Sequence, residues 1–80
     1  MLPLGSIFWG DNMYFQRIRD LREDHDKTQQ EIADYLHTHR NAYRRYETGE
    51  REIPVSALLK LADLYHVSLD YLTGRTDDRA

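Results

Sequence analysis

The segment from Thr28 to Arg51 restricts the possible folds more than any other part of the chain. Thr28 followed three residues later by Glu31 is a capping box, which begins helices because each side chain bonds an otherwise unpaired backbone N–H. Helical spacing of apolar residues follows, is interrupted between Leu36 and His39, and stops at Thr48-Gly49. The sequence therefore predicts two short helices joined by a tight turn.

The rest of the chain from Met13 onward is also helical in pattern. Apolar residues at spacings of three and four predict a first helix that ends near residues 24–25, and Pro54 suits the first turn of a fourth helix. Ser68 is placed to cap a short fifth helix that Gly74 ends. We expect burial of Tyr14, Ile18 and Leu21 on the first helix, Ile32, Ala33 and Leu36 on the second, and Leu58, Leu61, Ala62 and Tyr65 on the fourth. The pattern predicts an all-α fold, a compact bundle of five helices over residues 13–74.

The two ends of the chain differ in character from this domain. Residues 1–12 carry one charge, one Pro and two Gly. Two explanations stay open. The segment is either a translated leader ahead of a natural start at Met13, or an apolar arm in which Ile7, Phe8 and Trp9 pack on the body or on a partner chain. Residues 75–80 are expected to form a flexible tail.

The composition excludes several classes of protein. Eighty residues form one small domain, and no apolar run approaches the roughly 20 residues that span a membrane. The absence of cysteine excludes disulfides and thiolate zinc sites and is compatible with a cytoplasmic location. The formal net charge is -3, yet three Arg and no acid lie between Thr38 and Tyr46. The net charge argues mildly against a nucleic-acid partner, whereas the focused positive charge is compatible with one.

The helix predicted over residues 39–47 has two faces of different character. At about 100° per residue, the outward face carries Arg40, Asn41 and Arg44, and the apolar face carries Ala42, Tyr43 and Tyr46. Arg45 lies at the margin, where its side chain can reach a phosphate. Arg pairs bidentately with guanine and Asn with adenine, each pair giving about 1–3 kcal/mol of discrimination. The alternative is that these residues only solvate an exposed helix, which holds for most helices taken alone.

Three sequence elements favour base recognition by this helix over a merely solvated helix face. They are T-Q-x-E-x-A-x-x-L from Thr28, Y-E-x-G-x-R from Tyr46 and V-S-x-D-x-L from Val67. In this order and spacing, over roughly residues 14–74, they resemble the Cro/cI-type helix-turn-helix family, the phage-repressor or XRE-like transcription regulators. The resemblance implies a lambda-repressor-like bundle in which the second and third helices form the helix-turn-helix and the third enters the DNA major groove.

The resemblance also implies a role for each matching residue. Arg40 and Asn41 match the principal base-reading positions, and Arg44 matches a further one. Gln29 matches a residue that holds a phosphate and braces the base-reading side chain. Contacts with the DNA backbone are expected from Gln29, Thr38, His39, Arg45 and Arg51. Arg22 and Glu47 match a partly buried ion pair between the first and third helices, which is a structural feature.

Three residues depart from the family pattern. His37 stands where the family usually has Gly. Gly is usual there because the turn requires a positive φ, which His tolerates imperfectly. His39 is a poorer N-cap than the usual Ser or Thr. Tyr43 replaces a smaller Ile or Val, so the packing under the third helix has to adjust.

Other chemistry has little support in the sequence. His37 and His39, with Asp34 nearby, do not converge easily on a metal ion, and no third ligand follows at a set spacing. No nucleophile motif or glycine-rich phosphate loop is present. We therefore expect no metal, no cofactor, no small-molecule ligand and no enzymatic activity.

The leading hypothesis is a sequence-specific DNA-binding transcription regulator, a repressor, that acts in the cytoplasm. It would bind an inverted-repeat operator in double-stranded DNA as a homodimer. The alternative is a protein-interaction module on the same scaffold, an antitoxin or anti-repressor, in which a partner protein matters more than DNA. The net charge of -3 and the short chain motivate this alternative.

Overall fold

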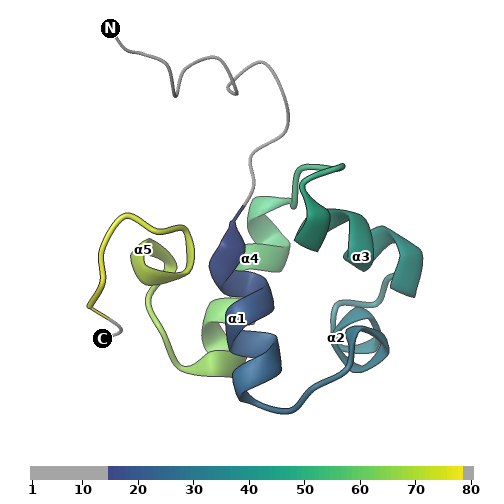
Figure 1. Cartoon of the computed structure of the whole chain (residues 1–80), viewed down its shortest axis with the longest axis horizontal. Helices are drawn as coiled ribbons and strands as arrows, with labels where there is room; N and C mark the ends of the chain where they lie inside the picture. Colours follow the sequence, from purple (N-terminus) through teal and green to yellow (C-terminus); the bar gives the residue numbers. More distant parts are fainter. Residues whose placement is uncertain (1–14, 79–80) are drawn as a thin grey trace, which may run out of the picture.

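The computed structural model describes residues 15–78, which form five helices and no strand. The helices are α1 (Gln16–Asp24), α2 (Gln29–Tyr35), α3 (Arg40–Thr48), α4 (Val55–Tyr65) and α5 (Leu69–Leu72). Figure 1 places α1 and α4 in the middle of the molecule, with α2 and α3 on one side and α5 on the other. The all-α, five-helix prediction is confirmed. The predicted segment 1–12 lies outside the described residues.

Local sequence signals begin and end these helices. The Thr28 hydroxyl accepts a hydrogen bond from the Glu31 N–H at 3.0 Å, and the Glu31 carboxylate accepts one from the Thr28 N–H at 2.8 Å, so the predicted capping box is present. Gly49 ends α3 at φ 83°. Pro54 lies at the N-cap of α4, immediately before the first turn in which we expected it.

A single core joins the helices. Its buried apolar residues are Ile18, Leu21, Ile32, Ala33, Tyr43, Ile53, Leu58, Leu61, Ala62, Tyr65 and Leu72. Leu36 is only partly buried because it caps the end of α2, and Tyr14 lies outside the described residues. Each fully buried Leu or Ile contributes about 1.5–3 kcal/mol to folding. The core thus fixes how α3 is presented, since α2 and α1 both pack against α3.

The C-terminal segment contacts α1 through one arginine. Arg17 donates hydrogen bonds to the carbonyl oxygens of Tyr71 and Thr76 and pairs with the Asp77 carboxylate. Its guanidinium also lies 4.1 Å from the centre of the Tyr71 ring. These contacts tie residues 76–77, within the segment expected to be a tail, to the start of the bundle.

Candidate nucleic-acid interface

The inner side of α3 is held by a buried carboxylate. Glu47 is 3% exposed and accepts hydrogen bonds from Arg22 Nε at 2.5 Å and Arg22 Nη2 at 3.1 Å. Gln29 Nε2 donates to Glu47 Oε1 at 3.1 Å. Because Arg22 is on α1 and Gln29 on α2, a single carboxylate of α3 joins three helices. The ion pair implied for Arg22 and Glu47 therefore lies at the base of the candidate interface.

The electrostatics of this network keep both partners charged. Burial alone would raise the pKa of Glu47, but hydrogen bonds from Arg22 and Gln29 and the nearby Tyr43 hydroxyl outweigh it and hold the pKa below its ordinary value. The hydrogen bond to Glu47 raises the pKa of Arg22. The pair is thus ionised in the folded protein, and its geometry is bidentate, which fixes orientation as well as distance.

The large residue under α3 is accommodated without exposure. The Tyr43 side chain is fully buried, and its ring meets Tyr46 edge-on with centroids 6.3 Å apart. Burial, with the Glu47 carboxylate beside it, raises the pKa of Tyr43, so its hydroxyl stays protonated. The adjustment expected for Tyr43 is therefore made inside the core, below the outward face of the helix.

The outward face of α3 carries the predicted base-reading side chains. Arg40, Asn41 and Arg45 are exposed, whereas Arg44 is half-buried. Arg44 Nη1 pairs with Glu50 Oε2 at 3.2 Å, just beyond the end of the helix. The structure thus groups these four residues on one surface, but one of them already has an anionic partner. Glu50 was not predicted as a site residue, since its only signal in the sequence is an acid directly after the Gly that ends α3.

The turn between α2 and α3 follows the predicted backbone path. His37 has a φ of 58°, the left-handed conformation expected where the family usually has Gly. The Thr38 N–H donates to the Ala33 carbonyl at 2.9 Å, which closes the turn. His39 is the N-cap of α3 and makes no side-chain capping bond, so the first N–H groups of α3 lack the usual protein partner.

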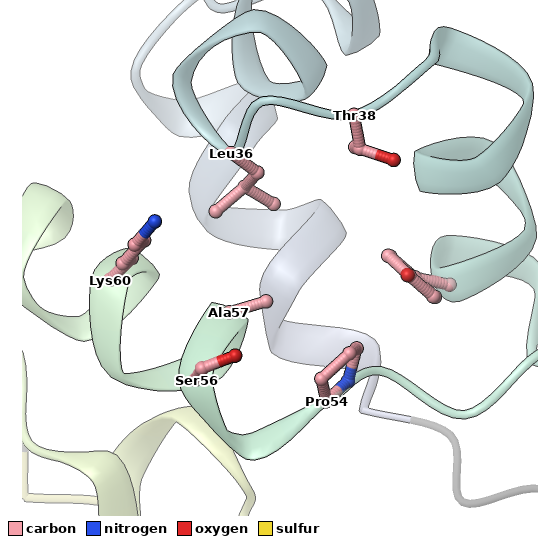
Figure 2. Close-up of a pocket in the computed structure, with 7 residues that line it drawn as sticks. Leu36, Thr38, Pro54, Ser56, Ala57 and Lys60 are labelled. Carbon is pink, nitrogen blue, oxygen red and sulfur yellow. The ribbon is translucent and has the colours of Figure 1, made fainter.

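A small cavity of about 120 Å³ lies between this turn and α4. Figure 2 shows Leu36 at the end of α2 and Thr38 in the turn, across from Pro54, Ser56, Ala57 and Lys60 at the N-cap and in the first half of α4. Tyr35 fixes the same junction, because its hydroxyl donates to the Lys60 carbonyl at 3.0 Å. The cavity separates the helix-turn-helix from α4 on the side where Thr38 lies.

The residues predicted to contact the DNA backbone differ in how exposed they are. His39, Arg45 and Arg51 are exposed, Thr38 is half-buried at the cavity, and Gln29 is half-buried. The Gln29 amide already donates to Glu47, so its bracing contact is to the ion pair inside the protein. Among residues 15–78 no group of His, Asp or Glu could hold a metal ion, and no helix is long and apolar enough to cross a membrane.

Comparison with known proteins identifies this arrangement. Residues 18–72 match a family model described as helix-turn-helix. The chain is 41% identical over 66 residues to the uncharacterized HTH-type transcriptional regulator YobD of Bacillus subtilis. The chain belongs to the Cro/cI-type helix-turn-helix family. The family resemblance and the lambda-repressor-like fold predicted from the sequence are both confirmed.

Other members of the Cro/cI-type family are similar over most of this chain. The HTH-type transcriptional regulator ImmR of B. subtilis is 37% identical over 78% of the chain, and the cryptic phage CTXphi transcriptional repressor RstR of Vibrio cholerae is 35% identical over 75%. A crystal structure of a transcriptional regulator from Listeria innocua superposes with a TM-score of 0.69 at 28% identity, covering 72% of this chain and 54% of that one. The matched part of the chain spans 59% of YobD, 49% of ImmR and 54% of RstR.

Proposed function

We propose that this chain is a non-enzymatic, sequence-specific DNA-binding transcription regulator, a repressor, acting in the cytoplasm. The observation that carries the proposal is the outward face of α3, on which Arg40, Asn41 and Arg45 are exposed together. The buried Arg22–Glu47 pair holds the opposite side of the same helix. An Arg and an Asn on a rigid helix face match the donors and acceptors that base pairs present in the major groove. The relatives named as regulators and repressors support the same function.

The proposed roles are those that the family pattern implies for these positions. Arg40, Asn41 and Arg44 contact base edges, and His39, Arg45 and Arg51 contact phosphates on either side. Thr38 and Gln29 stand at the start of the two helices, where backbone N–H groups favour an anion.

We further propose that the chain binds an inverted repeat as a homodimer, since two half-sites one helical turn apart mirror a two-fold axis. The support is an apolar surface on α4, where Val55 is 64% exposed and Leu59 is 50% exposed. Val55 also borders a groove of about 340 Å³ with Phe15, Leu58 and Leu69. Sedimentation with and without DNA tests this proposal, and a strict monomer on a two-half-site duplex would contradict it.

Fluorescence anisotropy against the DNA upstream of the gene tests the function directly. Affinity should fall steeply with added salt, because phosphate contacts release counterions. Arg40→Ala should lose about 1–3 kcal/mol of discrimination between the site and a scrambled duplex. Arg19→Ala is the matched control for net charge, since the Arg19 side chain is 54% exposed on α1 and belongs neither to the proposed DNA contacts nor to the groove.

The absence of binding to any duplex at low salt would overturn the proposed function. In that case the interaction-module alternative gains support if the product of a neighbouring gene binds the purified chain. Equal losses for Arg40→Ala and Arg19→Ala would show that only net charge matters and that α3 does not recognise bases.

A further inference from the structure

Arg44, on the outward face of α3, is held by an acid that follows the helix. Arg44 Nη1 lies 3.2 Å from Glu50 Oε2. The Thr48 hydroxyl donates a hydrogen bond to the same carboxylate oxygen at 3.0 Å, and the Glu50 N–H donates one to the Thr48 hydroxyl oxygen at 3.4 Å. The hydrogen bond from Thr48 and the charge of Arg44 lower the pKa of Glu50, so the carboxylate is ionised at neutral pH. Glu50 is therefore placed beside Arg44 by several contacts.

A carboxylate at this position is unfavourable on two counts. It follows the C-terminal end of α3, where the helix dipole favours a cation. It also precedes Arg51, a proposed phosphate contact, and so stands close to the path of a DNA backbone that it repels. The ion pair itself is exposed, with side chains 39% and 53% accessible, and exposed pairs add little to folding stability. Stability alone does not account for Glu50.

We propose that Glu50 is a specificity-determining residue, which occupies Arg44 in the free protein and releases it only to a base edge that offers two acceptors. The inference rests on the proposed DNA-binding function and deepens it. When Arg44 separates from Glu50, it loses one charged hydrogen bond. A guanine edge returns two bonds, through O6 and N7. A phosphate on unrelated DNA offers Arg44 an anion but brings that anion towards Glu50, so binding to unrelated DNA is penalised.

The test compares two isosteric substitutions. Glu50→Gln removes the charge beside Arg44 and keeps the size of the side chain, and Glu52→Gln removes an equal charge two residues further along the exposed chain. Each is made in the natural sequence and with Arg44→Ala. Binding is measured by anisotropy to a duplex obtained by selection on random DNA and to a scrambled duplex, at three salt concentrations. Thermal unfolding confirms that each variant is folded.

Glu50→Gln should tighten binding to the scrambled duplex about twofold to fivefold, with a smaller effect on the selected duplex. The ratio of the two affinities should therefore fall. With Arg44→Ala, the effect of Glu50→Gln should shrink to that of Glu52→Gln, because Arg44 is no longer present to be released.

Two outcomes overturn the inference while leaving the function standing. One is an equal effect of Glu50→Gln and Glu52→Gln in both backgrounds, which would mean that only net charge matters. The other is an unchanged affinity ratio for Glu50→Gln. If the unsubstituted protein binds neither duplex, the proposed function fails and the inference fails with it.

Discussion

The two sides of α3 each carry an Arg–Glu pair, and the pairs share their chemistry but not their surroundings. On the inner side, Arg22 and Glu47 are 12% and 3% exposed and bind through two hydrogen bonds. On the outer side, Arg44 and Glu50 are 39% and 53% exposed and meet through a single contact. The inner pair joins different helices, whereas the outer pair joins one helix to the loop that follows it.

The unequal exposure of the two pairs indicates which one can exchange its partner. A buried carboxylate left without its partner keeps an uncompensated charge away from water, so the inner pair resists separation. The outer side chains are rehydrated as they part, so their separation is nearly neutral. We infer that the inner pair fixes the position of α3 and that the outer pair can be traded for a DNA contact.

The largest expected effect comes from breaking the inner pair. Arg22→Ala should lower the free energy of unfolding by about 3 kcal/mol, because it leaves the nearly inaccessible Glu47 charge without its cationic partner. Glu47→Ala should cost less, since Arg22 is closer to the surface and keeps its hydrogen bond to the Lys27 carbonyl. Urea denaturation measures both. If Arg22→Ala destabilised the protein no more than Arg19→Ala, which removes an exposed Arg of the same helix, the pair would not be structural.

The next effect is the dependence of stability on pH. The folded-state pKa of Glu47 is lowered, so the unfolded chain binds its proton more tightly than the native protein does. The stability from this carboxylate is present above the ordinary pKa of 4.5 and is lost as pH falls through the lower folded value. Unfolding followed from pH 6 to pH 2 should therefore show an acid-labile protein. Glu47→Gln should flatten this dependence more than Glu50→Gln does, and the reverse order would contradict the assignment.

The sequence was sufficient to predict what depends on local patterns. Helical spacing and the Thr28–Glu31 capping box located α2 and α3, because each signal acts within one turn of the chain. The positive φ of His37 was also predictable from its place in the family pattern. His66 takes the same conformation at the end of α4 and was not predicted, since no comparable motif marks that position.

The contacts that distinguish the two sides of α3 were less predictable. Angular position on a helix gave the outward face, but it does not specify side-chain conformations or the path of a loop. Glu50 reaches Arg44 because the chain turns back after Gly49 in the left-handed conformation, which spacing along the helix does not encode. The same reason applies to Ile53, which is buried although it lies in the loop before α4.

The smallest expected effect is on stability when the outer pair is broken. Glu50→Ala and Arg44→Ala should each lower the free energy of unfolding by no more than about 1 kcal/mol, because an exposed ion pair contributes no more than that. Raising the salt concentration should reduce the small difference between each variant and the natural chain, since added ions screen the attraction between two exposed charges. A clear destabilisation by Glu50→Ala would show that the outer pair, like the inner one, stabilises the fold. Arg44 would then not be free to exchange its carboxylate for a base, so a stability effect of no more than about 1 kcal/mol is what the proposed specificity role of Glu50 requires.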